Sequence, residues 1–404
     1  MSPSIRRVSV SGAVIALGLA SLAACGSSSD NKSSDSGSSG GAKISAACKL
    51  DNPPTSGAKA PASGGPTGKA SGKVGVILPD TTSSTRYTLY DAPLLTSSLK
   101  AAGITPDVQN AQGDKNKFAS IAQNMIGEGV KVLIIDSIDA ASGAGVEKQA
   151  AAAGVKVIDY DRINLGGSAP YYVSFDNEDV GKLQAQTLVD CLDAQKGSKP
   201  KIIMMDGGTD VDNNAVLFKK GAHSVLDPLA AAGKLSIEQE AVVKGWKVEN
   251  AAPAFQQALT ASNGEVQGVL AANDDIGNAV IGVLKNQGLD GHVVVTGQDA
   301  GVAGLQNIVN GKQSMTVFKN VKLEAGAAAQ LAIALIGGKD PSSAGLTLAP
   351  FEDPQAPAHK VTALLLPSQV ITQSNLKDVV DAGALKVADI CKGIEAACTK
   401  IGLS

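Results

Sequence analysis

Short apolar runs alternate with longer amphipathic segments along most of the chain. The runs KVGVILP, KVLIIDS and VKVIDYD are continuous in Val, Ile and Leu and do not alternate with polar residues. Continuous runs are typical of parallel strands that are covered on both faces. Helical segments such as FASIAQNMIGEG separate these runs. The regular exchange of strand and helix predicts an α/β fold with a doubly wound parallel sheet.

The same alternation begins again after YYVSFDNEDVGKLQAQTLVDCL, with KIIMMDGG, GVLAAND and HVVVTGQD as further strands. About 330 residues follow Lys73, which is more than one small core usually holds, so we expect two lobes of similar construction. MTVFKN and VTALLLPSQV are expected to cross back between them in a multi-strand hinge. The predicted N-terminal lobe covers 73–176 plus about 320–355, and the C-terminal lobe covers 177–319 plus about 356–404.

Polar side chains follow nearly every predicted strand. In open α/β sheets ligands bind at the carboxyl ends of the strands, so two facing lobes would enclose a cleft rich in Asp, Asn and Arg. Asp161 and Arg162 offer carboxylate acceptors beside guanidinium donors, a set that suits a neutral polyol. The alternative is a solvated surface ion pair that contributes little. The strand ends are Pro79-Asp80, Asp136-Ser137, Asp161-Arg162, Asp206-Gly207-Gly208, Asn273-Asp274 and Gln298-Asp299.

The first 72 residues predict export and attachment to a membrane. Two early arginines precede an apolar run from Ala13 to Leu22 that is too short to span a bilayer, which indicates a signal peptide over 1–24. The SLAAC stretch resembles the lipobox of bacterial lipoproteins and predicts that Cys25 carries lipid. Residues 25–72 are mainly Ser, Gly, Lys, Ala and Pro, and we expect a flexible tether. The protein would then sit on the extracytoplasmic face of the cell membrane, held by its lipid anchor.

Composition argues against several functions. The net charge is −3 and no basic cluster of the kind that binds nucleic acid is present. None of the three histidines, His223, His292 and His359, stands at a nucleophile–base spacing, so we expect no enzyme. GGTDVDNN lacks the Lys-Ser/Thr of a phosphate-binding loop, and we expect neither a cofactor nor a metal.

Five cysteines are an odd number for an exported chain, and lipidation of Cys25 would leave four. On one continuous helix Cys391 and Cys398 would lie roughly 10 Å apart, too far for a disulfide. Gly393 could break that helix and allow the bond. A Cys48–Cys191 bond follows by elimination, and metal binding is the weaker alternative because no Cys-x-x-Cys occurs.

Several ordered motifs resemble the periplasmic sugar-binding proteins of ABC transporters, in particular the D-xylose-binding group. They are VKVIDYDRI, YYVSFDNEDVGKLQAQTLVD, GGTDVDNNAVLFKKGA, GWKVENA, AANDDIGNAVIGVL, GQDAGVAGLQNI and QSMTVFKN. The resemblance implies the type I periplasmic binding protein fold, a monomer, a monosaccharide ligand such as xylose or a similar aldose, and an ABC permease as partner. Carried over motif by motif, the implied ligand residues are Arg86, Tyr87, Asp161, Arg162, Asn214, Trp246, Asn273, Asp299 and Lys319.

The residue types fit a sugar. An aromatic ring covers the apolar C–H face of a pyranose, and Trp246 is the only tryptophan in the chain. Its neighbours Gly245 and Lys247 favour a half-exposed ring over ordinary core packing. Replacement of Asp161 by alanine is expected to weaken binding ~10–150-fold and to leave the fold intact.

Two other functions share this fold. A sugar-responsive repressor would need an N-terminal helix-turn-helix, but a signal peptide and a tether stand in that place. A lipoprotein that presents its sugar to a membrane receptor stays an open alternative, because closed lobes could dock on either partner.

Overall fold

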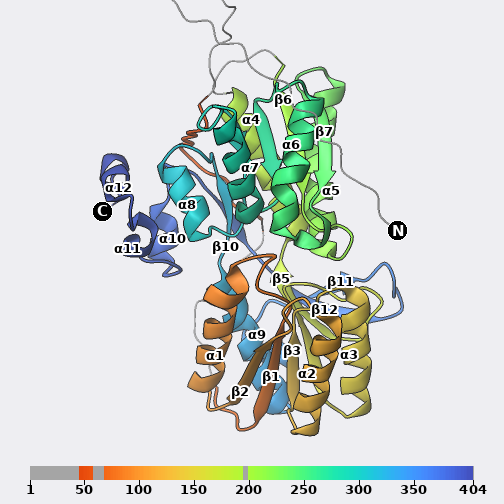
Figure 1. The fold of residues 1–404 in the computed structure, drawn as a ribbon. Coiled ribbons are helices and arrows are strands. Elements are labelled where there is room, and N and C mark those ends of the chain that lie inside the picture. Colours follow the sequence, from red (N-terminus) through yellow and green to blue (C-terminus); the bar gives the residue numbers. More distant parts are fainter. Residues whose placement is uncertain (1–44, 58–67, 194–198, 404) are drawn as a thin grey trace, which may run out of the picture. The chain divides into compact units, whose positions relative to one another are not determined.

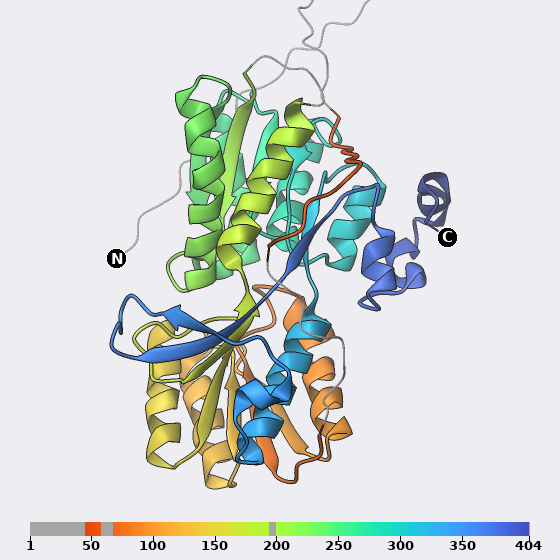
Figure 2. The ribbon, with the colours of Figure 1, turned by 180° about the vertical axis from the view of Figure 1, so that it is seen from behind.

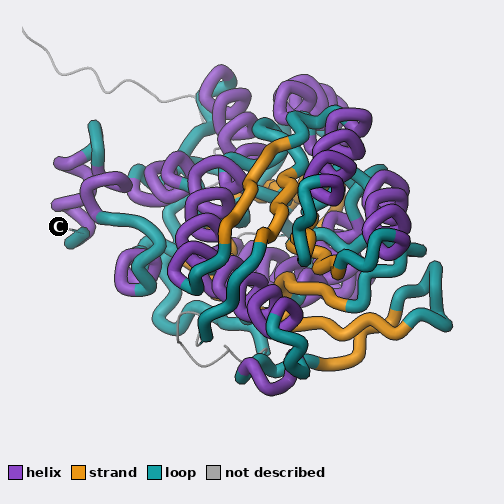
Figure 3. The backbone as a smooth tube through the Cα atoms, turned by 90° about the horizontal axis from the view of Figure 1, so that it is seen from below, coloured by secondary structure: helices purple, strands orange, loops and turns teal. Residues whose placement is uncertain are grey.

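The computed structural model describes residues 45–57, 68–193 and 199–403, which belong to one compact unit. The predicted signal peptide and Cys25 lie outside the described residues. Strands alternate with helices along the chain, and the helices flank the strands (Figures 1 and 3).

The N-terminal lobe is built on a seven-stranded sheet whose neighbours are parallel except for one edge pair, β11–β12. Apolar side chains of its central strands are buried on both faces, as the continuous Val and Ile runs predict. In sheet order the strands are β11 (Ala349–Glu352), β12 (Lys360–Leu366), β5 (Tyr171–Phe175), β4 (Lys156–Tyr160), β3 (Val132–Ile135), β1 (Lys73–Leu78) and β2 (Thr105–Asn110).

Helices cover both faces of this sheet and divide its core in two. One apolar cluster joins the sheet to α1 and α9, and another joins it to α2 and α3. Asp114 and Asp139 cap the N-termini of α2 and α3 by accepting backbone N–H bonds. The helical segments are η1 (Tyr87–Asp91), α1 (Ala92–Ala101), α2 (Lys115–Gly127), α3 (Ala140–Ala152), α9 (Val321–Ile336) and η4 (Pro341–Ala344).

The C-terminal lobe repeats this plan on a four-stranded parallel sheet. One cluster packs α6 and α7 against the sheet, and another packs α4 and α5 against the opposite face. The strands in sheet order are β7 (Ser236–Val242), β6 (Lys201–Asp206), β8 (Gly268–Ala271) and β9 (Val294–Val295). The helical segments are α4 (Asn177–Asp193), α5 (Asn213–Ala231), η2 (Lys244–Trp246), η3 (Val248–Asn250), α6 (Ala251–Ala261), α7 (Asp274–Asn286) and α8 (Val302–Val309).

The chain passes between the lobes three times: from β5 to α4, from β10 (Thr316–Lys319) to α9, and from β12 to β13 (Ser368–Ile371). β10 and β13 form an antiparallel pair, and a bridge from Val317 to Gln298 joins this pair to the C-terminal lobe. Figure 2 shows the crossings from behind. The predicted two-lobed, doubly wound α/β fold is confirmed.

One predicted lobe boundary is wrong. Residues from about 356 onward were expected in the C-terminal lobe, but β12 pairs in parallel with β5 in the N-terminal sheet. The change of lobe comes after Leu366, since the next strand, β13, pairs with β10. An apolar run such as VTALLL fits the interior of either sheet equally well, so the run does not reveal which sheet it joins.

The prediction of a flexible tether over 25–72 is wrong for its described part. Ala46 N donates to Gly291 O, and Ser56 N donates to Ser368 O. Cys48 is buried and forms a disulfide with Cys191 of α4, with a Cα–Cα distance of 5.6 Å. Few large apolar residues are needed here, because a covalent bond and backbone hydrogen bonds hold the segment on the C-terminal lobe.

A small helical layer of α10 (Lys377–Asp381), α11 (Val387–Cys391) and α12 (Glu395–Ile401) packs against α8. Gly393 adopts a φ of +80° between the last two helices, and a disulfide joins Cys391 to Cys398. The interruption brings the two cysteines within bonding distance. Within the described residues, no helix is both long enough and apolar enough to cross a bilayer.

Candidate functional site

Three of the six predicted polar strand ends, Asp161-Arg162, Asn273 and Gln298-Asp299, converge on one small cavity, whereas Asp80, Asp136-Ser137 and Asp206 do not line it. All nine ligand residues that the resemblance implied line it. Its volume is about 20 Å³, room for roughly one water molecule, because the side chains already contact one another. Five further lining residues were not among those nine: Ser83, Ser84, Asp212, Phe218 and Gln298.

Asp161 lies at the centre of the N-terminal half. Arg86 Nη1 donates to its Oδ1 at 3.1 Å and Tyr87 Oη donates to its Oδ2 at 3.2 Å, while Lys319 Nζ lies 3.8 Å from Oδ1. Burial by itself raises the pKa of Asp161, but Arg86, Lys319 and Arg162 outweigh burial and lower that pKa to about 2. The carboxylate is therefore ionised at neutral pH in a position that water barely reaches.

Asp161 also has a strained backbone. Its φ is +58°, in the left-handed region that most residues avoid and that Asn and Asp tolerate best. Its carbonyl accepts hydrogen bonds from Ser174 Oγ at 2.7 Å and Asn214 Nδ2 at 2.8 Å. The surroundings thus fix both its backbone and its side chain, as expected where strain serves a site.

Two buried acids, Asp91 and Glu324, fix the side chain of Arg86. Nε and Nη2 donate to the two oxygens of Asp91 at 2.9 and 2.7 Å, and Nη2 also donates to Glu324 at 2.5 Å. Burial raises the pKa of Glu324 to about 8, although Arg86 opposes this rise. These contacts fix the guanidinium, so its Nη1 edge faces Asp161.

Arg162 completes this half of the cavity. Nη2 donates to Tyr87 Oη at 3.1 Å, and Nε lies 3.4 Å from Asp212 of the other lobe. Asp136 lies behind it, 3.7 Å away, and burial raises the pKa of that carboxyl well above its usual range. Asp161 and Arg162 are therefore both buried, and they do not form a solvated surface ion pair. Asp161 bonds to Arg86 and Tyr87, whereas Arg162 contacts Tyr87 and Asp212.

Two of the three aromatic side chains that line the cavity, Trp246 and Phe218, come from the C-terminal lobe. The expectation of a half-exposed Trp246 is wrong: the residue is 4% exposed and belongs to the core cluster around α6 and α7. Its Nε1 donates to Asp212 at 3.0 Å, and a Cβ on Gly207 would lie 2.1 Å from its Cη2 atom. The glycines after β6 therefore make room for the indole, which packs in the core while one part still lines the cavity.

Direct hydrogen bonds join the lobes beside the cavity. Asn273 Nδ2 donates to Ser83 O at 3.2 Å, and Ser84 Oγ donates to Asp299 at 3.0 Å. Lys319, on the crossing strand β10, lies 3.3 Å from Asp299. The two lobes are therefore in a closed arrangement around the cavity.

Asp212 could have been found from the sequence. It caps α5 by accepting the N–H of Asn214 at 2.8 Å, and the motif GGTDVDNN contains it. Ser83, Ser84 and Phe218 carry no such signal, because serine in a loop and phenylalanine in a helix are common in any fold.

The set of groups suits a neutral polyhydroxylated ligand. Three cations and several carboxylates and amides face one space, so hydroxyl groups could both donate and accept. Aromatic side chains of Tyr87, Trp246 and Phe218 supply apolar surface for C–H groups. Among the described residues, no group of His, Cys, Asp and Glu has the arrangement needed to hold a metal ion.

Two lobes joined by three crossings, with polar side chains gathered between them, form the architecture that solute-binding proteins share. Residues 74–340 match the periplasmic binding protein domain. The chain belongs to this periplasmic binding protein family, and membership in a family of binding proteins confirms that it is not an enzyme.

Individual relatives resemble the chain over most of its length. The D-xylose-binding periplasmic protein of Escherichia coli is 36% identical over 290 residues, covering 72% of this chain and 84% of that protein. The D-xylose-binding periplasmic protein of Haemophilus influenzae is 39% identical over 245 residues, covering 61% and 72%. A solute-binding protein from Chloroflexus aurantiacus, solved with D-glucose, has a TM-score of 0.71 at 30% identity and covers 78% of this chain and 97% of its own.

Proposed function

We propose that this protein is an extracytoplasmic solute-binding lipoprotein that captures a monosaccharide, xylose or a similar aldose, and delivers it to an ABC permease. The observation that carries the proposal is the convergence of nine implied ligand residues on one cavity between two lobes. The names of the relatives, D-xylose-binding proteins and a protein solved with D-glucose, support the sugar class.

The cavity implies a clamp mechanism. At about 20 Å³ it is too small for a pyranose, so the lobes separate before the sugar enters. The sugar then takes over contacts that the side chains make with one another, such as Arg86–Asp161 and Lys319–Asp299. Only the closed arrangement lets one sugar contact both lobes, and binding therefore shifts the population toward closure. The permease would recognise the closed form.

Each half of the cavity comes from the same chain, so no second copy is needed to complete it. We therefore expect a monomer. The bound sugar and a membrane permease are the proposed partners.

The sugar assignment predicts a stereospecific rise in melting temperature. A ligand that binds only the folded state stabilises it by about 2.7 kcal/mol at a hundredfold excess over Kd. D-xylose or D-glucose should therefore raise Tm by several degrees in a thermal-shift screen of aldopentoses and aldohexoses. L-xylose is the matched control, because it has the same composition and cannot present its hydroxyls to the same partners. Equal shifts for D- and L-xylose, or no shift for any aldose, would contradict the assignment.

The lipid anchor predicts a change of location without a change of binding. Cys25→Ser removes the thiol that would carry lipid, so the variant should leave the membrane fraction, and its sugar affinity should match that of the wild type. The first described residue is Ser45, twenty positions further along the chain, and no residue of the cavity lies near Cys25 in sequence. Fractionation and a sugar titration check the two parts. A variant that stays in the membrane fraction would rule out the anchor and leave the sugar site untouched.

A further inference from the structure

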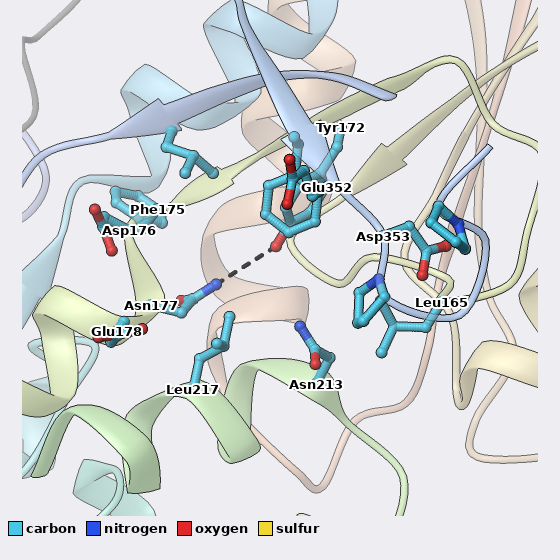
Figure 4. A pocket seen from close by; sticks show the side chains of 14 residues that line it. Leu165, Tyr172, Phe175, Asp176, Asn177, Glu178, Asn213, Leu217, Glu352 and Asp353 are labelled. Carbon is cyan, nitrogen blue, oxygen red and sulfur yellow. Dashed lines mark hydrogen bonds between the residues drawn. The ribbon is translucent and has the colours of Figure 1, made fainter. Parts of the chain in front are cut away.

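A second and larger cavity lies beside the sugar cavity where the lobes meet (Figure 4). Its volume is about 520 Å³, within the range of small-molecule sites. β5 and the β11–β12 hairpin line it from the N-terminal lobe, and the first turns of α4 and α5 line it from the C-terminal lobe. We call it the junction cavity.

A wall of hydrogen-bonded side chains separates the two cavities. Tyr172 Oη lies within hydrogen-bonding distance of Asp161 O at 3.1 Å and Asn214 Oδ1 at 3.2 Å, both on the sugar side. Asn177 Nδ2 reaches the same hydroxyl at 3.4 Å from the junction side, as the dashed line in Figure 4 shows. The junction cavity is therefore a separate compartment with its own lining.

Much of that lining is aromatic or aliphatic. Tyr172 and Phe351 meet edge to face with ring centroids 5.3 Å apart, and Phe175, Leu217 and Leu365 complete the apolar surface. A surface of this kind would bind the hydrocarbon part of a ligand and can place a ring next to a cation.

The charged side chains that line this surface are all carboxylates, and the side-chain amides of Asn177 and Asn213 line it as well (Figure 4). Asn177 is 3% exposed, and its Oδ1 is buried without a hydrogen-bond partner among the described residues. Glu352 forms no ion pair with any residue that the structure describes. Its cross-strand neighbour Lys360 does not line the cavity. Asp176 adds a second carboxylate, one oxygen of which accepts the backbone N–H of Asp179 at 3.1 Å.

Two other acids in the lining are already engaged. Lys182 and Lys220 neutralise Glu178 at 3.2 and 2.7 Å. Asp353 accepts the backbone N–H of Gly166 at 2.7 Å and shapes the hairpin loop. No lysine or arginine in the described chain lines the junction cavity.

We propose that the junction cavity binds a small organic ammonium ion with an apolar group. An ammonium has donors and no acceptor, so it matches Asn177 Oδ1, the Glu352 carboxylate and the second oxygen of Asp176. A neutral polyol could accept from the Asn213 amide but would form no ion pair with the carboxylates, and an anion would be repelled by them. The aromatic and aliphatic surface binds the hydrocarbon part.

Benzylammonium tests the proposal, with benzyl alcohol as its neutral isostere. Nuclear magnetic resonance of the full chain, following the Asn177 side-chain amide, should show saturable binding of benzylammonium. Benzyl alcohol should bind ~10-fold or more weakly, since it lacks the charge-assisted hydrogen bonds. Excess D-xylose should not displace benzylammonium, because the wall separates the two cavities. This result does not depend on which sugar, if any, the first cavity binds.

Two variants locate the site. Glu352→Gln keeps the size of the side chain and removes its charge, and should weaken benzylammonium binding ~3–10-fold. Phe351→Leu keeps an apolar side chain and removes the ring, and should weaken it ~2–5-fold. Glu249→Gln, an exposed carboxylate on η3, is the matched control and should bind as the wild type does. Absence of saturable binding, equal affinity for benzyl alcohol, or equal affinity in Glu352→Gln and Glu249→Gln would overturn the proposal.

Discussion

Asp161→Asn is expected to weaken binding of the preferred sugar by ~100-fold or more. Hydrogen bonds to a charged group contribute about 1.5–3 kcal/mol, which alone accounts for ~10–150-fold. The structure adds a second loss, because Asp161 is also the partner of Arg86 and Lys319. Without its charge these cations repel each other inside a closed cavity. Asparagine is the suitable replacement, since it tolerates the φ of +58° that would strain alanine.

Asp161→Asn should also lower the free energy of unfolding, because the side chain is buried among charged partners. Removal of one partner from a buried ion pair typically costs about 3–5 kcal/mol. The pKa of Asp161 is lowered to about 2, so its charge stabilises the native state fully above the unfolded pKa of about 3.9. This contribution is lost as the pH falls from about 4 toward 2.

Calorimetric titration with the sugar and urea unfolding at several pH values measure both effects. Asp381→Asn, an exposed carboxylate at the end of α10, is the matched control and should change neither quantity. The difference in unfolding free energy between wild type and Asp161→Asn should narrow below pH ~4. Wild-type affinity together with a stability loss under ~1 kcal/mol would mean that Asp161 behaves like a surface ion pair, and would remove the basis of the sugar site.

Removal of the Cys48–Cys191 disulfide is expected to cause the largest loss of unfolding free energy. The bond closes a loop with a sequence separation of 143, and loop-closure entropy for that length corresponds to about 5 kcal/mol. The Cys391–Cys398 bond closes a separation of only 7, for which the same relation yields about 2.5 kcal/mol. The long loop matters more because the unfolded chain gains more freedom when it opens.

The double variants Cys48→Ser/Cys191→Ser and Cys391→Ser/Cys398→Ser make a matched comparison without free thiols. Urea unfolding should show the larger loss of unfolding free energy in the Cys48→Ser/Cys191→Ser variant. Both variants should keep their sugar affinity at moderate temperature, since none of the four cysteines lines the sugar cavity. A smaller loss for the first pair than for the second would show that entropy of the unfolded chain does not govern these bonds.

Much of the fold followed from local pattern. Val and Ile runs such as VLII in β3 are buried throughout because a parallel sheet between two helix layers leaves no polar face. Polar residues after these runs marked the carboxyl edges of the strands, and parallel strands bring such edges together. The nine implied ligand residues depended on ordered motifs as well, since strand ends alone do not single out Asn214 or Trp246.

Other features depended on contacts between residues far apart in sequence. Trp246 is followed by Lys247 and preceded by Gly245, yet its ring is buried because Gly207 and Gly208 leave room for it. Nothing near Arg86 in sequence indicates that Glu324 of α9 holds its guanidinium, because that contact spans 238 residues. The pKa values of Asp161 and Glu324 likewise depend on burial and on charged residues far away in sequence.

The sequence by itself determined the two α/β lobes, the polar strand ends and the types of side chain available to a ligand, because periodicity and strand termination are local properties. Only the tertiary structure decided that β12 joins the N-terminal sheet, that residues 45–57 lie on the C-terminal lobe, and that a second cavity opens beside Tyr172. An apolar strand such as β12 can form its backbone hydrogen bonds inside either sheet. Which sheet the strand joins depends on packing and chain connections throughout the molecule. A short segment of sequence does not carry that information.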